Sequence, residues 1–108
     1  MDRMLFVLQR LTALLLLPLI IGHLIVILYA VKGGLTSAEI LARTQGSLWW
    51  GLFYGLFVVA VAIHAPIGLR NILKEWTPLS RVASGWLSLA FGLVLLWLGA
   101  RAIQGVVL

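Results

Sequence analysis

The sequence has no cysteine and very little charge. Only 10% of its 108 residues are Asp, Glu, Lys or Arg, whereas 63% are hydrophobic. The absence of cysteine excludes disulfide bonds, thiolate-bound zinc, iron–sulfur ligation by this chain and cysteine nucleophiles. A soluble domain carries charge at about a quarter of its positions, and this chain has too little to cover a polar surface. Its surroundings must therefore be largely lipid.

Acidic residues are scarcer than basic ones. The chain has 8 Lys and Arg against 3 Asp and Glu, which gives a formal net charge of +5. In a soluble protein such an excess would suggest nucleic-acid binding. Here the basic residues lie at the ends of apolar runs, where membrane topology and anionic headgroups explain them. We expect membrane lipid as a partner and no nucleic acid.

Three long apolar runs cover residues 11–31, 48–69 and 82–100. Each is close to the about 20 residues that cross the hydrocarbon core as a helix, and only helices satisfy the backbone of such runs in lipid. We predict an all-α integral membrane protein that forms a single domain over residues 1–108 and whose helical bundle is completed by a partner subunit. The predicted transmembrane helices span about residues 5–31, 47–75 and 82–105.

The polar connections carry helix signals of their own. Thr36 and Glu39 have the spacing of a capping box, which predicts a short interfacial helix over residues 37–44. Thr77-Pro78 predicts the end of the second long helix. Pro18 and Pro66 predict kinks, because each proline removes a donor from its helix.

The distribution of Lys and Arg predicts the orientation of the chain. Basic residues on the cytoplasmic side should outnumber those outside. The N-terminus and the second connection carry Arg3, Arg10, Arg70, Lys74 and Arg81. The first connection and the C-terminus carry Lys32, Arg43 and Arg101. We expect a multi-pass protein of a bacterial-type inner (cytoplasmic) membrane, with a cytoplasmic N-terminus and the C-terminus outside.

His23 and His64 are the only ionisable side chains within the apolar runs. An ionisable group in a membrane usually faces the bundle interior with a partner, and a neutral imidazole is a common axial ligand of haem iron. The alternative is a packing histidine that hydrogen-bonds to a neighbouring helix. His64 lies about 9 Å from Arg70 along its helix, whereas His23 lies about 20 Å from Arg10 on the same side. If both bind haem, they bind different haems.

Glycines accompany both histidines. Gly22 adjoins His23, and Gly68 lies one turn after His64 on the same face. A missing side chain lets a flat macrocycle approach a helix closely, but it also lets another helix do so. We predict that Gly22 and Gly68 pack against haem, with helix packing as the alternative.

Residues 64–76, HAPIGLRNILKEW, resemble the end of the second helix in cytochrome b-type membrane anchor subunits of succinate dehydrogenase and fumarate reductase, the respiratory complex II. The residues of the motif are a histidine, a glycine four residues later, and a basic or polar stretch that ends in an acidic–aromatic pair. Residues 9–12, QRLT, resemble the start of the first helix of those anchors. The three-helix layout agrees as well.

This resemblance implies roles for individual residues. It makes His64 an axial ligand of haem b and places Arg10 near the quinone site and the haem propionates. It makes His23 the ligand of a second haem, because two-haem anchors use histidines of both helices. The resemblance also places four further residues near the propionates and the quinone, namely Thr12, Arg70, Asn71 and Trp76. Trp76 stands where some members have tyrosine, and an indole N–H donates but cannot accept, so a direct quinone contact is in doubt there.

The resemblance implies a membrane anchor that passes electrons between an iron–sulfur subunit and a membrane quinone, ubiquinone or menaquinone. The implied partners are a flavoprotein subunit, an iron–sulfur subunit, and a second small anchor or a second copy of this chain that shares one or two haems b. Substrate chemistry then takes place on the flavin and not on this chain. Two alternatives are a haem-free structural anchor and a transporter. A proton-coupled transporter would carry an acidic residue in mid-membrane, and none of the three runs has one.

Overall fold

The computed structural model describes residues 2–108, and this part of the chain is all-helical without strands. Its elements are α1 (Asp2–Gly33), α2 (Ser37–Thr44), α3 (Leu48–Trp76) and α4 (Arg81–Val107). The three long helices are long and apolar enough to cross a membrane, over Arg3–Gly33, Leu48–Trp76 and Arg81–Val107. The all-α fold and its three membrane spans are therefore confirmed, with helix ends that differ from the predicted ones by a few residues.

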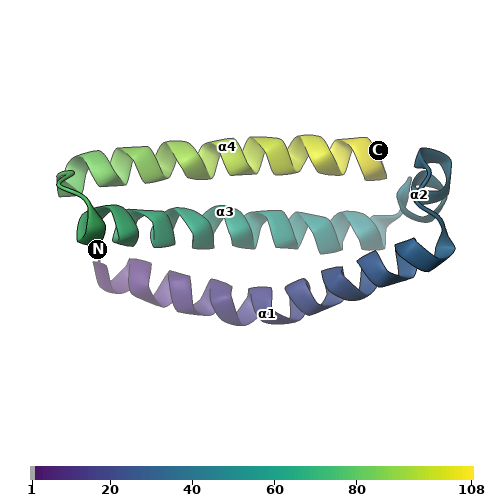
Figure 1. Cartoon of the computed structure of the whole chain (residues 1–108), viewed down its shortest axis with the longest axis horizontal. Helices are drawn as coiled ribbons and strands as arrows, with labels where there is room; N and C mark the ends of the chain where they lie inside the picture. The colour runs from purple at the N-terminus through teal and green to yellow at the C-terminus, as the bar shows by residue number, and fades with distance from the viewer. Residues whose placement is uncertain (1) are drawn as a thin grey trace.

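The long helices lie side by side in a row, with α3 between α1 and α4 (Figure 1). The start of α1 and the α3–α4 connection share one end of the molecule, and α2 and the C-terminus share the other. The helical part is elongated, with extents of 48 × 23 × 22 Å. An odd number of spans thus puts the two chain ends at opposite ends of the row.

Close packing between α1 and α3 is confined to a short stretch. Leu16 and Leu19 of α1 are buried against Ala60 of α3, and the rings of Phe53 and Phe57 pack around them. Pro18 lies between the two leucines, and α1 bends about midway along its length (Figure 1). A proline removes one helical hydrogen bond and clashes with the preceding turn, which accounts for the predicted bend.

The contact between α3 and α4 depends on small residues. A Cβ added to Gly99 would lie 2.4 Å from Val58 Cγ1, and one added to Gly92 would lie 2.7 Å from Pro66 Cγ. Ser84 and Ser88 continue the same stripe of α4 and are buried as well. Small residues let helix backbones approach closely in lipid, where no hydrophobic effect drives helices together. Because Gly92 leaves this space, the ring of Pro66 packs against α4.

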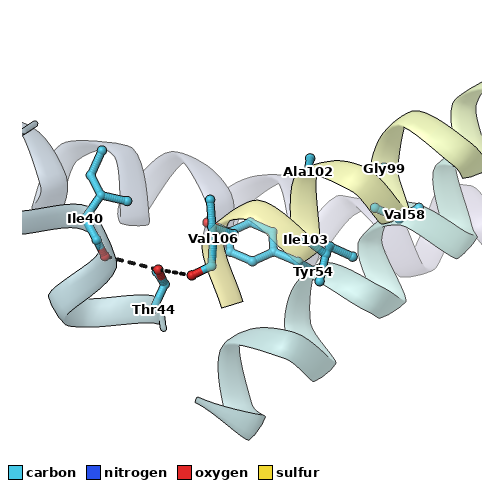
Figure 2. Close-up of a pocket in the computed structure, with 8 residues that line it drawn as sticks. All are labelled: Ile40, Thr44, Tyr54, Val58, Gly99, Ala102, Ile103 and Val106. Carbon is cyan, nitrogen blue, oxygen red and sulfur yellow. Dashed lines mark hydrogen bonds between the residues drawn. The ribbon is translucent and has the colours of Figure 1, made fainter. Parts of the chain in front are cut away.

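The short helix α2 forms as its capping box predicts. The Thr36 hydroxyl accepts a hydrogen bond from the Glu39 backbone N–H at 3.2 Å and donates to the Glu39 carboxylate at 2.6 Å. At the other end of α2, Thr44 Oγ1 donates its one proton to the Val106 carbonyl at 2.6 Å and lies 3.1 Å from the Ile40 carbonyl of its own helix (Figure 2). Thr44 thereby satisfies one of the carbonyl groups that the end of α4 leaves without a helical partner.

An apolar cavity lies where α2, α3 and α4 meet. Its volume is about 260 Å³, and the residues drawn in Figure 2 line it, among them Tyr54 and Val58 of α3 and Gly99 and Ala102 of α4. Outside this junction and the helix contacts, most large apolar side chains are exposed. Only 11%, 11% and 17% of the most apolar stretches of α1, α3 and α4 are buried, which leaves the faces of the row open to lipid or to a partner.

Candidate functional site

A polar cluster joins α1 and α3 near the start of α1. His64 Nδ1 lies 3.2 Å from the Gln9 carbonyl oxygen and 3.3 Å from Thr12 Oγ1. Asn71 Nδ2 donates a hydrogen bond of 3.3 Å to Gln9 Oε1. His64 and Asn71 lie two turns apart on the face of α3 that meets α1. The structure thus brings together His64, Thr12 and Asn71, three residues that the sequence placed in one site.

The hydrogen bonds of this cluster determine which nitrogen of His64 carries its proton. The Gln9 carbonyl oxygen can only accept, so Nδ1 must donate to it. The Thr12 hydroxyl donates at 2.7 Å to the Leu8 carbonyl, so its oxygen is left to accept. In the neutral form of the ring, this arrangement places the proton on Nδ1 and leaves the lone pair on Nε2. Nε2 has no hydrogen bond to any of residues 2–108.

An open groove lies beside His64. Its volume is about 320 Å³, and Phe6, Gln9, Arg10 and Ala13 line it together with His64. The Arg10 side chain is exposed, and its guanidinium carbon lies 5.1 Å from the centre of the Phe6 ring. The groove thus combines the imidazole of His64 with the guanidinium of Arg10.

The two predicted glycines lie against side chains of this chain. A Cβ added to Gly68 would lie 3.5 Å from Gln9 Nε2, and one added to Gly22 would lie 3.4 Å from the Phe53 ring. Each glycine therefore makes room between α1 and α3, as the helix-packing alternative expects. Packing of either glycine against haem stays a prediction.

His23 lies in a different environment. Its ring makes edge contacts with the rings of Tyr54 and Phe57, at centroid distances of 6.1 and 5.4 Å. Thr12, which contacts His64, lies about 17 Å from His23 along α1, and Phe57 lies about 10 Å from His64 along α3. The structure thus separates the two histidines in depth, as the sequence predicts, and does not bring them to one site.

Two predicted residues lie at the margin of the cluster. Arg70 precedes Asn71 on α3 and is half-buried, and Trp76 at the end of α3 is 80% exposed. Sequence reasoning gave no site role to Gln9, although its main-chain and side-chain oxygens both contact α3. The signal was an amide in an apolar helix, one turn before Thr12 on the same side.

Comparison with protein families matches residues 1–100 to the family described as Succinate dehydrogenase/Fumarate reductase transmembrane subunit. The chain belongs to this family. A comparison with curated proteins found no match, and neither did a comparison with solved structures. Membership in the succinate dehydrogenase/fumarate reductase transmembrane subunits agrees with the three membrane spans and implies assembly with other subunits.

The residues of the cluster fit haem rather than a metal ion held by this chain alone. Among residues 2–108 no three His, Asp or Glu side chains gather into a metal site. An axial haem ligand needs only one imidazole per chain, with a free lone pair on one nitrogen and a carbonyl that accepts from the other. His64 meets both conditions, and the Arg10 guanidinium in the same groove is a group that pairs with carboxylates.

Proposed function

We propose that this chain is a haem b-binding membrane anchor of a succinate:quinone oxidoreductase, which passes electrons between an iron–sulfur subunit and a membrane quinone. The observation that carries the proposal is the state of His64. Its Nδ1 proton is held by α1, and its Nε2 lone pair is left without a hydrogen-bond partner beside a groove that contains Arg10. Haem b, when bound, supplies a one-electron redox centre.

Each residue of the groove has a task in this proposal. His64 Nε2 would hold the haem iron, while the Gln9 carbonyl and the Thr12 oxygen lie at Nδ1 and orient the ring. The Arg10 guanidinium donates paired hydrogen bonds to a propionate or to a quinone carbonyl. Asn71 and Arg70 lie about two turns beyond His64 on α3 and do not line the groove, and Asn71 acts here through its hydrogen bond to Gln9.

In this proposal, a partner chain supplies a second histidine for the haem and covers the open faces of the helices. The open faces of the helix row leave room for a second small anchor or a second copy of this chain, which would provide a second histidine for the haem. The flavoprotein and iron–sulfur subunits dock at the end of the row that carries Arg3, Arg10, Lys74 and Arg81. That end faces the cytoplasm of a bacterial-type inner membrane, because it carries more basic residues than the opposite end.

The experiment that tests the proposal measures haem in the complex that co-purifies with this chain in mild detergent. We expect a reduced haem b spectrum and a pyridine haemochrome in the native complex. His64→Ala should remove the haem that this histidine binds, because alanine supplies no ligand. A haem b spectrum that stays intact in His64→Ala would refute the ligand assignment.

His23 is proposed as the ligand of a second haem. The measurement is the number of haems per complex, which should be two in the native protein and should fall to one in His23→Ala. A value near one that His23→Ala leaves unchanged would return His23 to a packing role among Tyr54 and Phe57.

A haem-free structural anchor is the second candidate, and one observation favours it. The hydrogen bonds of His64 to Gln9 and Thr12 are also those of a packing histidine. The haemochrome assay separates the candidates, because a haem-free anchor gives no signal while its flavin and iron–sulfur subunits still co-purify.

A further inference from the structure

We propose that Gln9 is a positioning residue for His64, and that its side-chain amide holds the α1 carbonyl in place beneath the imidazole. The inference rests on the proposed function, since it concerns how the axial ligand is oriented. Gln9 is not itself a ligand in this proposal. Its effect on the iron passes through the Nδ1–H of His64.

Gln9 meets α3 at three successive turns. Its main-chain oxygen accepts from His64 Nδ1 at 3.2 Å, and its Oε1 accepts from Asn71 Nδ2 at 3.3 Å. Between these two turns lies Gly68, where an added Cβ would lie 3.5 Å from Gln9 Nε2. His64, Gly68 and Asn71 share one face of α3 because they lie one and two turns apart. Gln9 alone therefore contacts residues at three successive turns of α3, from His64 to Asn71.

The side-chain bond fixes the main-chain bond. A backbone carbonyl keeps its chemistry in every variant, so its distance from Nδ1 depends on how α1 sits against α3. The Gln9–Asn71 bond joins the two helices one turn or more beyond the buried Thr12, at a level where Phe6 and Arg10 of α1 are exposed. Without the amide, α1 is free to shift, and the Nδ1–H···O contact lengthens.

Thr12 cannot replace Gln9 in this role. Its hydroxyl donates to the Leu8 carbonyl within its own helix, and its only contact with His64 is the 3.3 Å approach to Nδ1. No side-chain bond from Thr12 to another residue of α3 fixes the register of the two helices. A carbonyl that accepts from a ligating imidazole raises the basicity of the ligand nitrogen and sets the ring plane. The position of Gln9 should therefore tune both the haem affinity and the orientation of the imidazole.

The experiment uses the purified native complex and four variants, Gln9→Ala, Asn71→Ala, Gln9→Glu and Gln104→Ala. Two quantities are measured, namely the rate of haem transfer to excess apomyoglobin and the electron paramagnetic resonance spectrum of the oxidised low-spin haem. Glutamate keeps an oxygen that accepts from Asn71, so Gln9→Glu tests rescue. Gln104 lies at the opposite end of the row, where it bonds to Arg101, and serves as the matched control.

We expect Gln9→Ala and Asn71→Ala to release haem about 10-fold faster or more, as loss of an outer-shell partner does at other metal sites. Both should also shift the low-field resonance, which depends on the orientation of the axial imidazole planes. Gln9→Glu should retain the native resonance position, and Gln104→Ala should match the native protein in both measurements.

The outcomes separate the inference from the function on which it rests. A native complex without haem, or a haem that His64→Ala leaves intact, overturns the proposed function. Loss of haem in His64→Ala together with native behaviour of Gln9→Ala or Asn71→Ala overturns the inference alone. If Gln9→Ala does not assemble, the Asn71→Ala variant tests the inference, because it keeps Gln9 and removes only the hydrogen bond between Asn71 and Gln9.

Discussion

At the residue scale, the two membrane histidines differ in the groups that surround them. His64 has a carbonyl and a hydroxyl oxygen at Nδ1, whereas His23 has the edges of aromatic rings beside it. A hydrogen-bonded imidazole has a fixed tautomer and a fixed ring plane, and both properties favour ligation. The proposed haem site therefore depends on the neighbours of His64 as much as on the histidine itself.

Thr12→Val provides a test at this scale. Valine keeps the shape of threonine but removes the oxygen that lies 3.3 Å from Nδ1. We expect the complex to retain its haem, because the Gln9 carbonyl still accepts the proton, and to lose about 1 kcal/mol of stability. Haem content and thermal unfolding of the complex measure the two effects. Complete haem loss in Thr12→Val would show that the hydroxyl, and not the carbonyl, holds the ring.

At the scale of elements, α4 packs closely against α3 because glycines of α4 leave room for the side chains of α3. Gly92 and Gly99 lie where a methyl group would collide with Pro66 and Val58. In lipid, no hydrophobic effect drives two helices together. The distance between the backbones of α3 and α4 therefore decides how much van der Waals energy their packing gains. The glycines of α4 are structural for this reason, and none of them lines the groove of His64.

Gly99→Ala should loosen the α3–α4 pair. The new methyl group would overlap Val58, and overpacking of this kind costs about 1–3 kcal/mol. We expect a lower unfolding temperature of the complex in mild detergent, with recovery in the double variant Gly99→Ala/Val58→Ala. Gly105→Ala is the matched control, since an added Cβ there meets no atom within 4 Å. Equal unfolding temperatures for Gly99→Ala and Gly105→Ala would contradict the packing described.

Thr44→Val should free α2 from the end of α4. The variant loses the hydroxyl that donates to the Val106 carbonyl at 2.6 Å, a net loss of about 1 kcal/mol. Amide hydrogens of residues 37–44 should then exchange about five-fold faster, whereas Thr44→Ser, which keeps the donor, should exchange at the native rate. Unchanged exchange in Thr44→Val would mean that the backbone bond from Gly46 to the Val107 carbonyl suffices.

At the scale of the whole molecule, the three spans form an open row rather than a closed bundle. α1 and α4 lie on opposite sides of α3, so each keeps most of its surface for lipid or for another chain (Figure 1). The groove of His64 opens on such a surface, between α1 and α3. A partner that covers this groove would complete the haem site and the bundle at the same time.

The orientation of the row is testable because the chain has no native cysteine. Ser37→Cys at the start of α2 should react with a membrane-impermeant maleimide in intact cells. Glu75→Cys at the end of α3 should react only after the membrane is opened, if the basic end faces inward as proposed. The reverse pattern of labelling would place the soluble subunits and the His64 groove on the outer side.

Much of the molecule was predictable from local features of the sequence. The spans follow from apolar runs of sufficient length, and the short helix α2 follows from Thr36 and Glu39. The separation of His23 and His64 in depth follows from counting residues along a helix of known rise. Contacts between helices were harder to predict from the sequence. A Cβ added to Gly99 would overlap Val58, whereas one added to Gly55 or Gly105 would meet nothing within 4 Å, and the sequence around these glycines does not distinguish them.

The chain sequence by itself therefore determined the membrane environment, the number and limits of the spans, and the depth of each histidine. Lipid forces every backbone group into a helix, so length and apolarity are enough to define a span. Only the tertiary structure decided that α3 lies in the middle, that Gln9 meets His64 and Asn71, and that Nε2 keeps the free lone pair. In a soluble helix an apolar stripe marks the packed face. Here the helices are apolar on every side, so the sequence pattern does not distinguish a surface that faces lipid from one that faces a neighbouring helix.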